Sequence, residues 1–115
     1  MNKMHIAQLL SLGQFDLVLD HFSEHIMWHI VGQQRLNGLL EVQKHCFNIK
    51  QYFETIEHDF KIIGEFESDD TCIIQGTATF ISASVTTHIE ACDIYTFDSD
   101  QQLIRIESYC IEVQK

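Results

Sequence analysis

Hydrophobic residues follow two different periodicities in this chain, and the change falls near residue 56. Before that point, apolar positions mostly recur every three or four residues, which is the spacing of an amphipathic helix. After it, apolar and polar residues alternate, which is the pattern of a strand with one buried face. Helices followed by strands predict an α+β fold in which the helices pack on one face of a sheet.

The first half of the chain contains three helical patterns. The first is short and stops at Gly13, a residue that often ends a helix. The second begins at Phe15 and predicts a helix that continues to Phe22. The third is the longest, and its apolar residues at spacings of three and four predict a helix from Leu39 to about Thr55.

Strands are predicted both between the helices and after them. Residues 26–31 are apolar on both faces, which indicates a short strand buried on both sides, and a polar turn follows over 33–38. Four longer strands are predicted at 58–67, 71–83, 86–97 and 103–113. The short polar turns between them predict an antiparallel meander.

Length and composition restrict the class of protein. A chain of 115 residues supports one hydrophobic core, so we expect a single domain over residues 1–115. No apolar stretch is long enough to span a membrane and no signal peptide is recognisable, so we expect a cytoplasmic protein. The net charge of −10 disfavours binding to nucleic acid or to an anionic membrane. The four cysteines are far apart, which is typical of buried thiols rather than of disulfides or a zinc site.

Asp93 is the first candidate for chemistry. In the strand predicted at 86–97 it lies on the more apolar face, the one that should point toward the helices. A buried carboxyl group must be hydrogen-bonded, or protonated with a raised pKa. Asp93 is therefore either a functional acid or a structural carboxylate held by the backbone, by tyrosine hydroxyls or at a subunit interface.

His29 is the second candidate, and it lies beside the only tryptophan, Trp28. A histidine can exchange a proton near neutral pH, so a buried one can act in proton transfer, but it can equally be a packed core residue. The proton-transfer interpretation requires His29 and Asp93 to meet in one cavity. His21, His25 and His29 are four residues apart, but the strand pattern at 26–31 interrupts any helix that would align them, so no metal site is predicted.

The order of these elements resembles the NTF2-like superfamily, in particular its ketosteroid isomerase and SnoaL-like polyketide cyclase branch. The resemblance rests on residues 13–22, on 27–32 with Gly38, on 93–97 and on 103–109, and it covers nearly the whole chain. It implies a curved antiparallel sheet wrapped around N-terminal helices as a cone, with a central apolar pocket. It also implies a homodimer formed through the outer face of the sheet.

The resemblance further implies roles for particular residues. His29 corresponds to the general base of the ketosteroid isomerases, and Asp93 corresponds to the aspartic acid of their oxyanion hole. Ile6 replaces their tyrosine donor, which disfavours steroid isomerisation. The pocket is expected to be lined by apolar residues, namely Ile6, Met27, Ile106 and Cys110.

Two functions remain open at this stage. In the first, the protein is an acid–base enzyme of the isomerase, cyclase or hydratase type that acts on a small organic molecule with His29 and Asp93. In the second, it is a non-catalytic ligand-binding or dimerisation module. Neither interpretation requires a cofactor or a metal.

Overall fold

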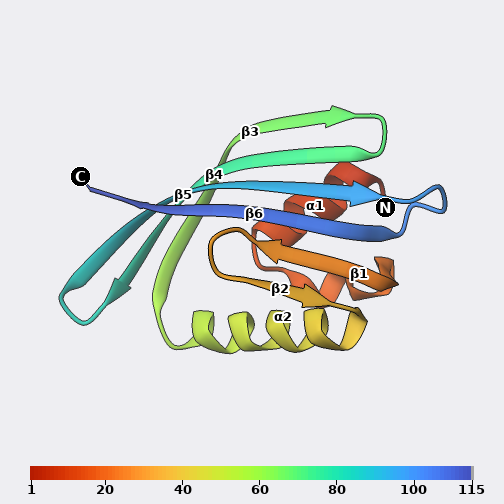
Figure 1. The fold of residues 1–115 in the computed structure, drawn as a ribbon. Helices are drawn as coiled ribbons and strands as arrows, with labels where there is room; N and C mark the ends of the chain where they lie inside the picture. Colours follow the sequence, from red (N-terminus) through yellow and green to blue (C-terminus); the bar gives the residue numbers. More distant parts are fainter. Residues whose placement is uncertain (115) are drawn as a thin grey trace.

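One six-stranded sheet organises the chain, and its strands lie in the order β2–β1–β6–β5–β4–β3 (Figure 1). The computed structural model describes residues 1–114. The helices are α1 (Lys3–Ser11) and α2 (Leu39–Glu54), and two short 3₁₀ helices are η1 (Phe15–Leu17) and η2 (Leu19–His21). The strands are β1 (Phe22–Ile30), β2 (Gln34–Asn37), β3 (Glu57–Ser68), β4 (Thr71–Ser82), β5 (Val85–Phe97) and β6 (Leu103–Val113).

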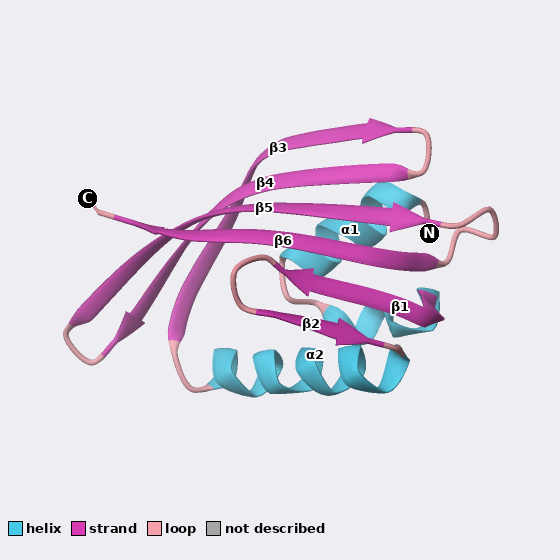
Figure 2. Ribbon diagram, in the orientation of Figure 1, coloured by secondary structure: helices cyan, strands magenta, loops and turns pink. Residues whose placement is uncertain are grey.

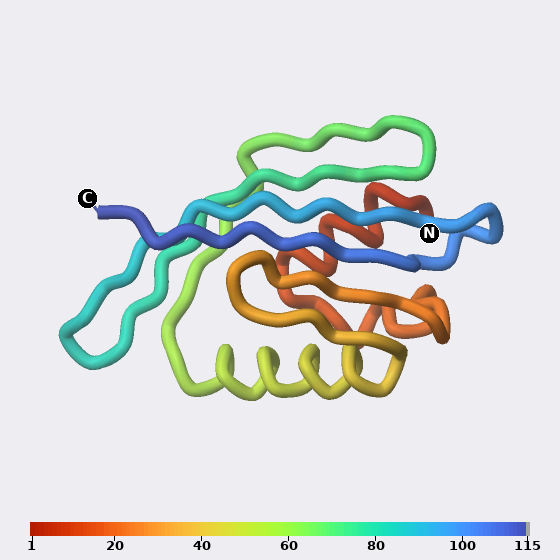
Figure 3. Tube along the Cα trace, in the orientation of Figure 1, coloured from red at the N-terminus to blue at the C-terminus, as the bar shows by residue number. Residues whose placement is uncertain are grey.

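The four long strands form the predicted antiparallel meander. Each of β3, β4 and β5 pairs with the next strand along the chain, in antiparallel orientation. The strands bend strongly along their length, so that the hairpin joining β4 and β5 projects beside one end of α2 (Figure 3). The α+β fold with a curved sheet is therefore confirmed.

The direction of β1 differs from the expectation of a wholly antiparallel sheet. β1 pairs in parallel with β6, and only its other neighbour, β2, is antiparallel. The sheet is consequently mixed. The hydrophobic pattern of a short strand records which faces are buried but contains no information about the direction of its partner, so this pairing could not be predicted from the sequence.

Both helices pack against the sheet and enclose the core. α1 contacts β4 and β5, whereas α2 runs along β1 and β2 and reaches the start of β3 (Figure 2). The side chain of Asn2 caps α1 by accepting a hydrogen bond of 2.8 Å from the His5 backbone N–H. Neither helix in residues 1–114 is long and apolar enough to cross a membrane.

The helix predicted from Phe15 to Phe22 is wrong. The segment instead forms η1 and η2, and β1 already begins at Phe22. Phe15, Val18 and Phe22 are nevertheless buried, as the pattern indicated. Two single 3₁₀ turns place these side chains in the core at the same spacing as a helix would, so the burial was predicted correctly and the backbone conformation was not.

Candidate functional site

A cavity of about 520 Å³ lies between the curved sheet and the two helices. The last residues of α1, one side of α2 and inward-facing residues of five strands form its walls. Most of the lining is apolar or aromatic: Leu10, Gly13, Phe15, Trp28, Ile30, Ile49, Tyr52, Phe53, Phe60, Ala78, Phe80, Ile89, Ala91, Tyr95, Ile106 and Cys110. Six further lining residues are polar: Ser11, Gln33, His45, Asn48, Asp93 and Ser108. An apolar cavity of this size with a few polar groups is typical of a small-molecule site.

Stacked aromatic rings line the cavity where α2 ends. Phe53 of α2 stacks on Phe80 of β4 with 5.8 Å between ring centroids, and Tyr52 lies 6.5 Å from the same Phe80 ring. His58, at the start of β3, stacks on Phe53 at 4.5 Å. These rings join α2 to the bent part of the sheet and give this end of the cavity a flat, apolar lining.

Asp93 lies on the inner face of β5 and is the centre of a hydrogen-bond network. The Ser11 hydroxyl, at the end of α1, donates to Asp93 Oδ2 at 3.1 Å. Ser11 Oγ is also 2.7 Å from the Tyr95 hydroxyl, which can therefore donate to Ser11. The chain Tyr95–Ser11–Asp93 thus directs its hydroxyl hydrogens toward the carboxyl group.

A second chain of hydrogen bonds reaches Asp93 from β1 and β6. Trp28 Nε1–H donates to Ser108 Oγ at 3.0 Å. Because the Trp28 N–H can only donate, the Ser108 hydroxyl keeps its own hydrogen for another acceptor. Ser108 lies opposite Asp93 in the β5–β6 pair and hydrogen-bonds to its carboxyl group. Trp28 therefore helps to orient Asp93 although the two residues lie on different strands.

Burial raises the pKa of Asp93 above its ordinary value. Hydrogen bonds from Ser108, Ser11 and Tyr95 act in the opposite direction, but the effect of burial is larger. Burial and the nearby Asp93 likewise raise the pKa of Tyr95 well above its ordinary value. A carboxyl group with a raised pKa keeps its proton to higher pH, and in that state it can donate a hydrogen bond into the cavity.

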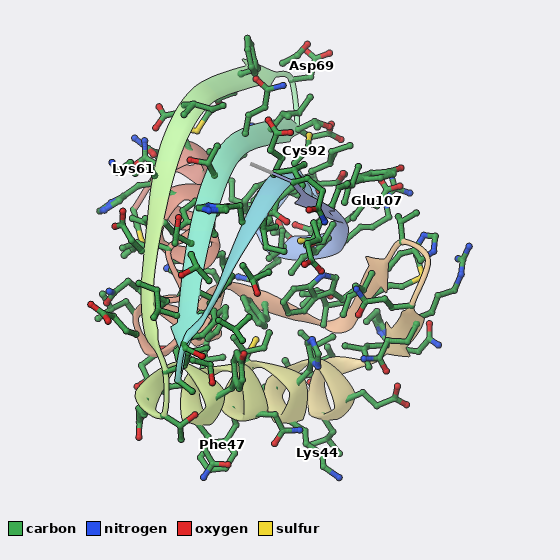
Figure 4. All side chains as sticks on the ribbon, turned by 90° about the vertical axis from the view of Figure 1, so that its left-hand side faces the viewer. Lys44, Phe47, Lys61, Asp69, Cys92 and Glu107 are labelled. Atoms are coloured by element: carbon green, nitrogen blue, oxygen red, sulfur yellow. The ribbon has the colours of Figure 1, made fainter. Side chains whose placement is uncertain are left out.

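His45 is a second ionisable group in the cavity, and it was not predicted from the sequence. It lies on the side of α2 that faces the sheet, whereas its neighbours Lys44 and Phe47 extend away from the sheet (Figure 4). Its ring meets Trp28 edge-on, with 5.0 Å between ring centroids and an interplanar angle of 87°. Burial lowers the pKa of His45, which favours a neutral imidazole.

Three of the predicted site residues do line the cavity, namely Asp93, Ile106 and Cys110. Ile106 is fully buried and belongs to the core as well. The Cys110 thiol has a pKa raised to about 11, first by burial and second by the charge of Asp93. At neutral pH Cys110 is therefore a thiol, which fits the lining role predicted for it.

His29 does not reach the cavity, so the structure does not bring it together with Asp93. In the β1–β6 pair, Trp28 lies beside Ile106 and Ile30 beside Ser108, and all four of these residues line the cavity. His29 lies between them beside Glu107, and alternate residues of a strand point to opposite faces. Glu107 extends from the outer side of the sheet, away from α1 (Figure 4). The expectation that His29 and Asp93 meet in one cavity is therefore not met, because only Asp93 lines it.

Ile6 and Met27 do not line the cavity either. Ile6 is buried on α1, but only the C-terminal end of that helix reaches the cavity, and Ile6 lies a full turn earlier. Met27 lies beside Arg105 on the same outer face as His29. Ser11 is the α1 residue that supplies a hydroxyl to the site. Nothing in the sequence indicated this role of Ser11 except its position next to the helix end.

Comparison with solved structures identifies the fold. No protein-family model matches the sequence, and no curated protein sequence matches it. An NTF2-like protein of unknown function from Cytophaga hutchinsonii is 28% identical, with a TM-score of 0.85 over 93% of this chain and 94% of that protein. Together with the curved sheet, this similarity shows that the chain belongs to the NTF2-like superfamily.

More distant structures share the fold alone. An LEH-like epoxide hydrolase from Mycobacterium tuberculosis is 14% identical, with a TM-score of 0.72 over 95% of this chain and 82% of that one. A candidate SnoaL-like polyketide cyclase from Shewanella denitrificans is 12% identical, with a TM-score of 0.74 over 95% and 90% of the two chains. The identities are too low to transfer an activity, because one fold supports many unrelated functions.

Proposed function

We propose that the protein binds a small, uncharged and largely apolar organic molecule in this cavity, and that protonated Asp93 donates a hydrogen bond to a ligand oxygen. The observation that carries the proposal is the position of Asp93, a partly buried carboxyl group oriented by Ser11 and Ser108 on an otherwise apolar wall. A protonated acid in such surroundings is a strong donor to a carbonyl or hydroxyl oxygen.

The charge of the lining supports an uncharged ligand. Among residues 1–114, no lysine or arginine lines the cavity, so within this part of the chain a carboxylate or phosphate ligand would have no lysine or arginine as a partner. The chain also carries a net charge of −10, which repels anions at longer range. An anionic ligand would therefore have to leave water without compensation.

Acid–base catalysis of the isomerase, cyclase or hydratase type is the activity that we propose for this site. Similar folds are described as an epoxide hydrolase and as a candidate polyketide cyclase, which supports a catalytic function without identifying the reaction. The alternative is a ligand-binding module without catalysis, in which Asp93 only anchors the ligand.

We also propose a homodimer formed through the outer face of the sheet, where Ile63 and Ile111 are 66% and 63% exposed.

Three naphthalene compounds with similar skeletons test the ligand proposal. The ketone 2-acetonaphthone only accepts hydrogen bonds, 2-naphthoate is an anion, and 1-(2-naphthyl)ethylamine is a cation at neutral pH. Trp28 is the only tryptophan and lines the cavity, so saturable quenching of its fluorescence reports occupancy directly. We expect the ketone to bind and 2-naphthoate to bind at least about tenfold more weakly, because burying an unpaired charge costs several times a neutral hydrogen bond.

Variants show whether Asp93 holds the ligand. Asp93→Ala should weaken ketone binding about tenfold, the value of one hydrogen bond, whereas Asp59→Ala, at an exposed carboxyl outside the cavity, should leave it unchanged. Absence of saturable quenching by the ketone would contradict the proposal. Tighter binding of the amine than of the ketone would show that Asp93 acts as an ionised counter-ion, and would contradict its role as a donor.

A further inference from the structure

We propose that His45 is the general base of this cavity and removes a carbon-bound proton next to the carbonyl group of a ketone anchored by Asp93. The proposal rests on the proposed function, because it needs a ligand oxygen at Asp93. It assigns the catalytic role to a histidine on α2 rather than to His29 on β1.

The geometry places His45 and Asp93 in one cavity, linked by a chain of contacts through Trp28 and Ser108. His45 packs edge-on against Trp28, Trp28 donates to Ser108, and Ser108 hydrogen-bonds to Asp93. All four residues line the same cavity, with His45 on the helix side and Asp93 on the sheet side. A flat ligand that lies against Trp28 can therefore offer its oxygen to Asp93 and an adjacent carbon to His45.

Elimination among the ionisable groups of the cavity also leads to His45. Asp93 is the proposed donor, and the Tyr95 hydroxyl is hydrogen-bonded to Ser11 and Asp93, with its pKa raised well above its ordinary value. The Cys110 thiol has a pKa of about 11 and is therefore protonated at neutral pH. Tyr52 lies on the last turn of α2, where its side chain is 54% exposed to solvent. Burial lowers the pKa of His45, which favours the neutral imidazole. The unprotonated ring nitrogen of a neutral imidazole can accept a proton.

The proton-transfer step balances within the site. The C–H bond next to the carbonyl breaks, its proton passes to a ring nitrogen of His45, and its electron pair forms the C=C bond of an enolate. The negative charge collects on the ligand oxygen, which receives the hydrogen bond from Asp93. Return of a proton from His45 to carbon restores the ketone, and no oxidant, reductant or metal is consumed. In D₂O the proton on His45 exchanges with solvent, so deuterium replaces hydrogen on the carbon.

Deuterium exchange into the methyl group of 2-acetonaphthone, followed by NMR in D₂O, tests this assignment. We expect the protein to accelerate exchange over buffer, and His45→Gln to slow the accelerated rate by about a hundredfold, the lower end of what a general base contributes. Binding of the ketone, measured by Trp28 quenching, should change less than about threefold in His45→Gln. His25→Gln, at an exposed histidine of β1 outside the cavity, is the matched control and should keep the wild-type rate.

Chemical rescue separates a proton-transfer role from a structural one. His45→Ala should lose the exchange activity and regain part of it when imidazole is added, since a free imidazole can occupy the vacated space. A structural role would give no rescue.

Failure of the base assignment is distinguishable from failure of the ligand proposal. If the protein binds the ketone but does not accelerate exchange, or if His45→Gln exchanges as fast as wild type, the role of His45 is overturned while ligand binding stands. Loss of exchange in His29→Gln but not in His45→Gln would also overturn it. If the ketone does not bind at all, the proposed function itself fails.

Discussion

At Asp93, burial and hydrogen bonding act on one carboxyl group in opposite directions. Three hydroxyl groups favour the ionised form, whereas the apolar surroundings favour the neutral form, and the second effect is the larger. The folded protein therefore holds the Asp93 proton more tightly than the unfolded chain does. This difference makes the stability of the protein depend on pH.

The sign of this dependence gives the first prediction. As pH rises from the ordinary aspartate pKa of about 4 through the raised pKa of folded Asp93, the unfolded chain loses its proton first. The free energy of unfolding of wild type should fall across this window and stay lower above it. The side chain at position 93 of the Asp93→Asn variant cannot ionise. The free energy of unfolding of this variant, relative to that of wild type, should therefore increase from pH 4 to pH 8. Urea denaturation at a series of pH values measures this, and a difference that is independent of pH would contradict it.

Residue placement could be predicted where one face of a strand is clearly more apolar than the other. The inner face of β5 was identified in this way, and with it the position of Asp93. β1 is different, because the face with Trp28 and the face with His29 are both largely apolar. Only the register with β6 decides which of them faces the cavity. His45 had a recognisable signal, since it lies one turn before Ile49 at the border of the apolar stripe of α2, but a polar residue there is usually solvated.

At the level of elements, the length of each helix or strand decided how well its bounds could be predicted from the sequence. α2 was predicted within a residue because its stripe runs over four turns, and β3 to β6 were predicted within one or two residues. The segment at 15–22 is only two turns long, and such a segment can bury the same side chains as 3₁₀ turns or as a helix. The β2 strand was missed because its residues are mostly exposed and polar.

The close packing of β3 and β4 gives a second prediction. A Cβ atom on Gly76 would lie 2.3 Å from Phe60 Cζ and 2.9 Å from the Lys61 backbone oxygen. Gly76→Ala must therefore push the Phe60 ring, which lines the cavity, out of its position. We expect a loss of about 1–3 kcal/mol in unfolding free energy, together with weaker ketone binding.

A substitution at the other glycine of β3–β4 is the appropriate comparison for Gly76→Ala. At Gly64 the nearest atoms to an added Cβ are the ends of the Gln75 and Phe66 side chains rather than backbone. Phe66 is 54% exposed and can move outward, so Gly64→Ala should leave ketone binding unchanged. Equal effects of the two substitutions on binding would contradict the role of Gly76 in leaving room for Phe60.

At the level of the whole molecule, the outer sheet face is the surface that we expect a second copy to cover. Ile63, Tyr109 and Ile111 surround a shallow groove on this face. Exposed apolar groups that lie together mark association surfaces. Ile111→Glu should shift the protein from dimer to monomer in light-scattering measurements of molar mass. Leu40→Glu, at an 83% exposed leucine on α2, introduces the same charge elsewhere and should not. A monomeric wild type, or a dimer unaffected by Ile111→Glu, would contradict the proposed interface.

The parallel pairing of β1 with β6 also determines when the fold can be completed. Trp28 lies beside Ile106, so the middle of the sheet joins positions that are 78 residues apart in the chain. Such a contact requires the closure of a long loop, which slows folding relative to the local hairpins. During synthesis, β1 and β5 are both made before β6, so the edge of each strand that pairs with β6 stays unpaired until β6 is made. Until residues 103–113 are made, these edges can pair with other chains, so β6 protects the protein from aggregation.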